Sequence, residues 1–179
     1  MEFIKCDIEG LYIIKPKIFG DNRGYFCETY KKEEFEKNIG KVIWLQENQS
    51  KSTKGVLRGL HFQKGEFSQA KLVRVVKGSV FDVAVDLRKD SPTYGQYFSV
   101  ELSEDNMLQF YIPRGFAHGF LVLSDEAVFE YKVDNIYLPK VEGSLLWNDK
   151  TINIDWPYME NYLLSEKDKN APLLGDYTF

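Results

Sequence analysis

The stretch 71-KLVRVVKGSVFDVAVDLR-88 decides the fold class. It contains two runs rich in β-branched and apolar residues, with the turn-forming pair Lys77-Gly78 between them. If this pair is a two-residue hairpin loop, Val75 faces Val80 and Val73 faces Asp82. Lys71 and Asp82 would then be diagonal neighbours on one face, about 7–8 Å apart. The stretch therefore predicts strands that carry charged groups on an otherwise apolar face.

Strands of the same kind follow each other at short intervals on both sides of this block. If residues 124–127 form a four-residue loop, Phe120 pairs with Tyr131, and His118 becomes a diagonal neighbour of Tyr131. Helices are expected only at 31–40, closed by Gly40, and just after Ser165. Many short, evenly spaced strands indicate an all-β sandwich or barrel. The expected strands are 11–19, 25–30, a segment starting at 41, 56–63, 70–76, 79–87, 97–102, 107–113, 118–124 and 127–133.

Composition limits the class of protein. A chain of 179 residues favours one domain, residues 1–179, with a sizeable core. The net charge of −4 argues against nonspecific nucleic-acid binding and against a polybasic membrane contact. No apolar run has transmembrane length, and the N-terminus is not a signal peptide. Two cysteines, Cys6 and Cys27, fit reduced thiols in the cytoplasm.

The chain has only two histidines, His61 and His118. A barrel metal site needs three or four ligands, often with closely spaced histidines, whereas His61 is followed two residues later by Gln63. We therefore expect no metal. His61 is either a core histidine with a backbone partner or a general base. Asp168, in 165-SEKD-168, is either part of a helix capping box or the carboxylate that orients such a base.

Other candidate residues have equally plain structural interpretations. Arg58 and Lys71 could be solvated cations, and Tyr131 could be a core aromatic. Strict alternation puts Arg58 and His61 on opposite faces of their strand. A bulge or bend near Gly59 is needed for both to face one pocket.

At this point the chain resembles the dTDP-4-dehydrorhamnose 3,5-epimerase family, through motifs that run along nearly its whole length. The resemblance implies a cupin jelly roll of antiparallel strands and a cytoplasmic homodimer. It also implies metal-free, cofactor-free epimerisation of a dTDP-sugar for cell-surface polysaccharide such as lipopolysaccharide. The matching segments are 19-FGDNRGYFCETY-30, 46-QENQS-50, 55-GVLRGLHFQ-63, 69-QAKLVRVVKGSVFDVAVDLR-88, 91-SPTYGQ-96, 112-IPRGFAHGF-120, 130-EYKVDNIY-137, 147-WNDKTINIDWP-157 and 163-LLSEKD-168.

The resemblance also implies roles for individual residues. His61 matches the base, Asp168 its orienting carboxylate, and Tyr131 the acid on the opposite face of the sugar. Lys71 matches the cation at the ketone oxygen. The residues implied in substrate binding are Arg23, Phe26, Glu28, Gln46, Asn48, Arg58, Asp82, His118 and Tyr137.

The implied reaction converts dTDP-4-keto-6-deoxy-D-glucose to dTDP-4-keto-L-rhamnose by inverting carbons 3 and 5 through an enolate. Two departures from the family pattern, 64-KGEFSQ-69 without its usual proline and Asn135-Ile136 before Tyr137, do not touch the proton chemistry. Two alternatives stay open at this point. One is an epimerase that inverts a single centre, and the other is a non-catalytic cupin that binds nucleotide sugars.

Overall fold

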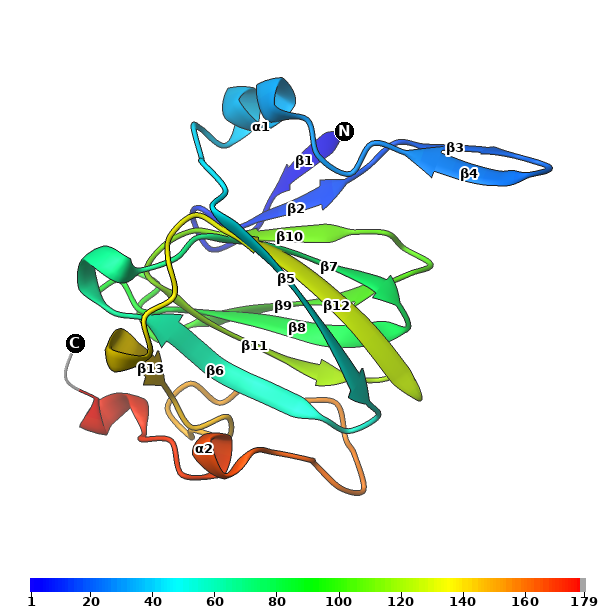
Figure 1. Cartoon of the computed structure of the whole chain (residues 1–179). Coiled ribbons are helices and arrows are strands. Elements are labelled where there is room, and N and C mark those ends of the chain that lie inside the picture. Colours follow the sequence, from blue (N-terminus) through cyan, green and yellow to red (C-terminus); the bar gives the residue numbers. More distant parts are fainter. Residues whose placement is uncertain (178–179) are drawn as a thin grey trace.

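The computed structural model describes residues 1–177, which form two antiparallel sheets packed face to face and one projecting hairpin (Figure 1). The six-stranded sheet contains, in spatial order, β1 (Glu2–Lys5), β2 (Tyr12–Lys15), β10 (Gln109–Ile112), β7 (Lys71–Lys77), β12 (Glu126–Val133) and β5 (Gln46–Thr53). The five-stranded sheet contains β13 (Glu142–Ser144), β6 (Leu57–Gln63), β11 (Phe116–Val122), β8 (Ser79–Asp86) and β9 (Tyr97–Ser103). The projecting hairpin is β3 (Ile18–Asp21) with β4 (Gly24–Cys27). The predicted mainly β jelly-roll barrel is confirmed.

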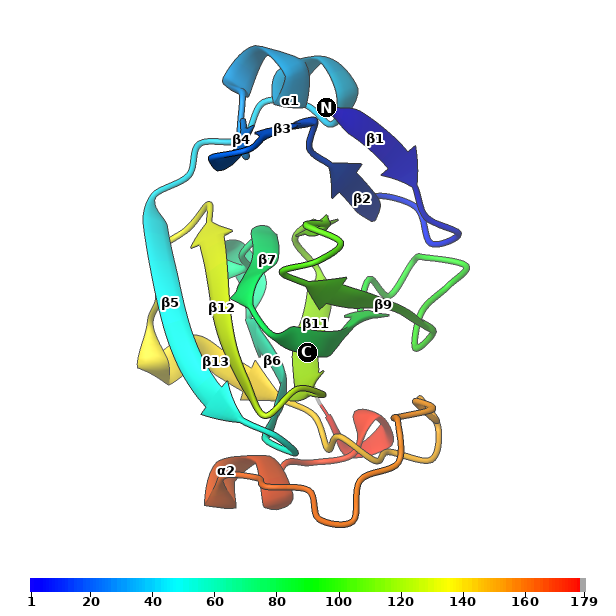
Figure 2. The ribbon, with the colours of Figure 1, turned by 90° about the vertical axis from the view of Figure 1, so that its right-hand side faces the viewer.

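Helices are short and lie outside the sheets. They are α1 (Lys32–Asn38), α2 (Glu166–Lys169) and the 3-10 turns η1 (Gly65–Phe67), η2 (Pro139–Val141) and η3 (Leu174–Asp176). Both helices agree with the sequence: Gly40 follows α1 with φ +126°, and Ser165 caps α2. Figure 2 shows α1 with β1 and β2 at one end of the molecule and α2 at the other.

Burial on both faces explains why several strands read as continuous apolar runs. In β8, Val80 and Ala84 face the core between the two sheets, whereas Val83 and Val85 face a second cluster on the outer side. Residues near the C-terminus, including Ile152 and Leu174, cover that second cluster. A third cluster packs Phe35 of α1 against the outer face of the six-stranded sheet.

The structure contradicts both predicted hairpin registers. Lys77-Gly78 does connect β7 to β8, but the two strands enter different sheets, so Val75 pairs with Phe129 instead of Val80. Phe120 pairs with Asp82 and Arg58 instead of Tyr131, because β11 and β12 also lie in different sheets. The segment from residue 41 becomes a strand only at Gln46. The physical reason is that the core forms between two sheets, in which β7 pairs with β10 and β12 while β8 pairs with β11 and β9, so this short turn carries the chain from one sheet to the other.

The predicted bulge near Gly59 is confirmed. His118 pairs with His61 and Phe120 with Arg58, so three steps along β6 match two along β11. Gly59 has φ +133°, and a Cβ there would lie 2.5 Å from the Cα of Gly119. This extra residue puts Arg58 and His61 on the same face of β6, which strict alternation would not allow.

Candidate functional site

Titratable side chains from both sheets meet in the space between them. His61, Asp82 and His118 come from the five-stranded sheet, and Lys71 and Tyr131 come from the six-stranded sheet. Neighbouring residues along each strand point the other way. Phe62, beside His61, for example belongs to the second cluster, on the outer side of the five-stranded sheet. The barrel fold therefore directs these five side chains inward.

His61 is held by a carboxylate that lies 107 residues further along the chain. Its Nε2 is 2.6 Å from Oδ1 of Asp168, a residue that is only 3% exposed. Burial opposes ionisation of Asp168, but the hydrogen bond with His61 gives its carboxyl a lowered pKa. The backbone N–H of Asp168 donates to Oγ of Ser165 at 3.1 Å. Asp168 thus donates its backbone N–H to the helix cap and directs its carboxylate at His61. The Ser165 half of the predicted capping box is confirmed.

His118 forms a second histidine–carboxylate pair, deeper in the barrel. Its Nε2 lies 3.0 Å from both carboxylate oxygens of Asp82, which is fully buried. Burial lowers the pKa of His118, and the nearby Lys71 and His61 add to this effect, while Asp82 opposes it. The imidazole of His118 is accordingly neutral at physiological pH.

Lys71 begins β7 and faces the His118–Asp82 pair of the other sheet. Burial lowers the pKa of its amine to about 8, although the negative charges of Asp82 and Glu142 counteract this. Lys71 and Asp82 are therefore neighbours across the barrel, not diagonal partners in a hairpin. A partly buried cation favours a ligand oxygen that carries negative charge.

Tyr131 lies on β12, next to polar groups of β5. Asn48 is its cross-strand neighbour and hydrogen-bonds with it, and Gln46 Nε2 donates to Asn48 Oδ1 at 2.7 Å. Burial raises the pKa of the Tyr131 phenol, which Arg58 and Asn48 partly offset. Arg58 is exposed and donates from Nε to Ser52 Oγ at 3.1 Å, across the gap between the two sheets.

The structure does not bring all predicted site residues together. Arg23 is in the turn of the projecting hairpin, where it pairs with Asp21, and its side chain is 85% exposed. Phe26 is 68% exposed, and Glu28 follows the same hairpin (Figure 1). Tyr137, after β12, is half exposed at the rim, and its hydroxyl donates to Glu142 Oε2 at 3.1 Å.

Sequence reasoning missed Glu142 and the full role of Gln63. Glu142 pairs with Gln63 across β13 and β6, close enough to Lys71 and Tyr131 to affect their pKa values. Gln63 is buried, and its Oε1 accepts the backbone N–H of Leu138 at 3.0 Å. No motif or periodicity marks Glu142, because it lies in a three-residue edge strand.

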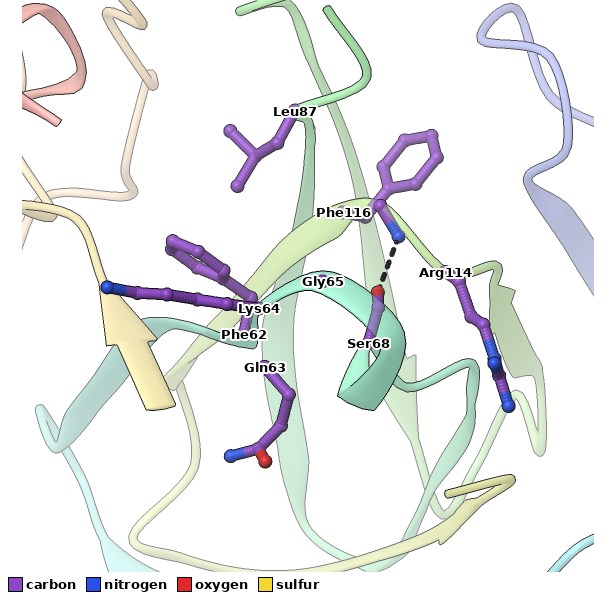
Figure 3. A pocket seen from close by; sticks show the side chains of 9 residues that line it. Phe62, Gln63, Lys64, Gly65, Ser68, Leu87, Arg114 and Phe116 are labelled. Atoms are coloured by element: carbon purple, nitrogen blue, oxygen red, sulfur yellow. Dashed lines mark hydrogen bonds between the residues drawn. The ribbon is translucent and has the colours of Figure 1, made fainter. Parts of the chain in front are cut away.

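A cavity of about 390 Å³ opens at the C-terminal end of β6, beside η1 (Figure 3). Apolar side chains of Phe62, Leu87 and Phe116 line it. Gly115 donates its N–H to Ser68 Oγ at 3.0 Å within it. Its cations are engaged: Arg114 pairs with Asp134, and Lys64 lies over the ring of Tyr177. The cavity contains none of the predicted site residues.

The inward-facing groups suit proton transfer next to a carbonyl. The five-stranded sheet supplies the His61 imidazole, which has a carboxylate partner. The other sheet supplies the Tyr131 phenol and the Lys71 ammonium, and such groups can move a proton or stabilise an oxyanion. In residues 1–177 no group of three or more His, Cys, Asp or Glu side chains is placed to hold a metal ion. Over the same residues, no helix is long and apolar enough to cross a membrane.

Comparisons with known proteins agree with this geometry. A family model described as dTDP-4-dehydrorhamnose 3,5-epimerase matches residues 5–176. The dTDP-4-dehydrorhamnose 3,5-epimerase of Salmonella typhimurium is 56% identical over 97% of this chain and 96% of its own length. A solved Legionella pneumophila 3,5-epimerase in complex with dTDP-4-keto-L-rhamnose has a TM-score of 0.96 at 48% identity, covering 99% of this chain and 94% of that one. A 3'-monoepimerase of Streptomyces bikiniensis, in complex with dTDP-quinovose, has a TM-score of 0.91 at 34% identity, covering 96% and 87%.

Proposed function

The chain belongs to the dTDP-4-dehydrorhamnose 3,5-epimerase family, and from this premise we propose how its own residues carry out the reaction. The enzyme is an isomerase that inverts carbons 3 and 5 of dTDP-4-keto-6-deoxy-D-glucose to give dTDP-4-keto-L-rhamnose. Protons on both carbons are acidic because each carbon is next to the ketone at carbon 4. The observation that carries the residue assignment is the His61–Asp168 pair, which faces Tyr131 and Lys71 across the barrel.

His61 is the base that removes the proton from carbon 3 or carbon 5. In the proposed tautomer, Nε2–H of His61 donates a hydrogen bond to Asp168, which leaves the lone pair of Nδ1 free to take up the substrate proton. The same carboxylate stabilises the imidazolium once it forms. This arrangement contributes about 10²–10⁴-fold in rate.

Lys71 stabilises the enolate that results. Proton removal transfers negative charge to the ketone oxygen, and a fixed ammonium group favours that state more than the neutral ketone. Asp82 and Glu142 keep Lys71 protonated in spite of its burial. Because neutral His118 engages Asp82, it adds no second positive charge beside Lys71.

Tyr131 returns a proton to the face opposite His61. Inversion needs a donor and an acceptor on opposite faces of the sugar ring, and these two residues come from opposite sheets. The raised pKa of Tyr131 keeps its phenol protonated until the enolate needs the proton.

The nucleotide part of the substrate lies toward the rim, where Arg58, Gln46 and Asn48 meet the phosphates and sugar and Tyr137 stacks on the base. Arg23, Phe26 and Glu28 of the projecting hairpin serve the site of a second copy. The homodimer that this requires is supported by the exposed apolar side chains of the hairpin, Ile18, Phe19, Tyr25 and Phe26.

Residues 1–179 act as one domain in this proposal, in the cytoplasm, without metal or cofactor. The cytoplasm keeps thiols reduced, and this fits the two free cysteines, Cys6 and Cys27. Sedimentation of the purified protein tests the assembly, and a monomer at working concentrations would contradict the role of the hairpin.

Proton NMR with dTDP-4-keto-6-deoxyglucose in heavy water, with a chelator present, tests the reaction. We expect deuterium at carbons 3 and 5, with the product removed by a reductase that accepts the inverted sugar. Deuterium at only one carbon would indicate a single-centre epimerase, the activity of the Streptomyces bikiniensis neighbour. Binding without any exchange would leave only a nucleotide-sugar-binding cupin.

A further inference from the structure

Glu142 makes two polar contacts that no step of the proposed reaction uses. Its Oε2 accepts the hydroxyl proton of Tyr137 at 3.1 Å and pairs with Nζ of Lys167 at 2.6 Å. The side chain of Glu142 is 23% exposed, so its carboxylate is partly shielded from water. One carboxylate therefore connects two segments that are far apart in the sequence.

Both segments lie outside the two large sheets. Tyr137 belongs to the connection between β12 and η2, and Lys167 belongs to α2, which has only four residues. Such short segments have little packing of their own to fix them. Glu142, in contrast, is anchored, because β13 pairs with β6 through Glu142 with Gln63 and Ser144 with His61 (Figure 1).

Each connected segment carries a residue of the proposed site. Lys167 immediately precedes Asp168, whose carboxylate contacts His61. Tyr137 is the residue assigned to the nucleobase. A shift of α2 would change the His61–Asp168 distance, whereas a shift of Tyr137 would change nucleotide binding.

We propose that Glu142 is a positioning residue, which holds α2 through Lys167 and the nucleobase-facing Tyr137 through its hydroxyl. The inference rests on the function proposed above for Asp168 and Tyr137. The two contacts of Glu142 then affect different kinetic parameters. The Lys167 contact supports kcat through Asp168 and His61, and the Tyr137 contact supports KM for the nucleotide sugar.

Single variants separate the two contacts. Lys167→Ala removes the ion pair, together with a positive charge that helps to lower the pKa of Asp168, and should lower kcat about three- to tenfold with KM unchanged. Glu142→Gln leaves that charge in place and so tests the ion pair alone. Tyr137→Phe keeps the ring, loses the hydroxyl, and should raise KM with little change in kcat. Glu142→Gln keeps an acceptor for Tyr137 but loses the charge, so it should resemble Lys167→Ala. The assays belong at about pH 6.5, where Lys71 remains protonated in all variants.

α2 provides a matched control. Lys169 is another cation of the same helix, 50% exposed, and pairs with Glu166 at 2.6 Å instead of with the site. Lys169→Ala should leave kcat and KM at wild-type values. Thermal unfolding of every variant shows whether the fold is intact, and Glu142→Gln preserves the volume of the side chain.

The double variant Glu142→Gln with Lys167→Ala completes the test. Its kcat should be no lower than that of the less active single variant, because both substitutions break the same contact. The inference is overturned if Lys167→Ala and Lys169→Ala behave alike, or if the two losses multiply in the double variant. An inactive wild-type enzyme would instead refute the proposed function, so the two failures are distinguishable.

Discussion

The lowered pKa of Lys71 makes activity and stability change in opposite directions as the pH rises. With a pKa of about 8, Lys71 loses its charge within the range in which most enzymes are assayed. The groups that face it are Asp82 on β8, Glu142 on β13 and His118 on β11. Because the proposed enolate needs the ammonium form, kcat/KM should fall above about pH 8, roughly tenfold per pH unit, and we call this decline the alkaline limb. Tyr131 does not produce this limb, because burial raises its pKa.

Substitutions at and near Lys71 test the assignment of the alkaline limb. Lys71→Arg keeps a positive charge to far higher pH, so the limb should disappear although the rate is lower. Asp82→Asn removes a negative charge that supports the ammonium and should shift the limb to lower pH. Lys71→Met should lower kcat by about 10²–10³-fold. The assay is the initial rate of deuterium incorporation at substrate concentrations well below KM across the pH range, which measures kcat/KM.

The same lysine weakens the fold at neutral pH. Its pKa is about 8 in the folded state and 10.5 in the unfolded reference, so the unfolded chain binds more protons between these values. The contribution of Lys71 to the free energy of unfolding therefore rises with pH through that window. The full difference corresponds to about 3 kcal/mol, and partial exposure reduces this to about 1–3 kcal/mol. Lys71→Met should be more stable than wild type by that amount at neutral pH and should lose the advantage near pH 10.5.

Urea unfolding at neutral and alkaline pH measures this difference. Cys6, with a pKa raised by burial to about 11, and Tyr111, raised to about 12, titrate in both proteins and cancel in the comparison. An alkaline limb that is identical in Lys71→Arg and wild type would refute the reasoning. So would a Lys71→Met protein with no gain in stability at neutral pH.

Three other outcomes are expected. Asp168→Asn should slow exchange at both carbons by about 10²-fold and leave the cap of α2 in place; a loss of thermal stability alone, with normal exchange, would limit Asp168 to a structural role. Tyr131→Phe should let exchange from the His61 face continue while inversion fails, as seen by NMR of the product, and unchanged product would remove Tyr131 from the acid role. Gly59→Ala should destabilise the protein by about 2–4 kcal/mol in urea unfolding, because its Cβ would lie 2.5 Å from a backbone carbon of β11. Gly24→Ala is the matched control, with nearly the same φ of +132° and nothing within 4 Å, and an equal loss in both variants would show that backbone conformation alone matters.

The sequence alone predicted the elements and the chemistry of individual residues. Alternating β-branched runs such as 79–87 predict strands because side-chain direction in a strand repeats every two residues. The need for a bulge at Gly59 followed from the spacing of Arg58 and His61, and the register of β6 against β11 confirms it. The two histidines and Lys71 were identifiable because few residue types can transfer a proton or hold a charge in an apolar strand.

Only the tertiary structure decided which strands are neighbours. A two-residue turn such as Lys77-Gly78 allows either a hairpin or a crossing to the opposite sheet, and the local sequence does not distinguish them. The choice depends on burying both faces of β7 and β8, which involves residues far away in the chain. For the same reason the contact of Asp168 with His61, over 107 residues, and the position of Glu142 beside Lys71 became visible only in the fold. Periodicity determines the direction of a side chain along its own strand, whereas the partner across the barrel is determined by how the whole core packs.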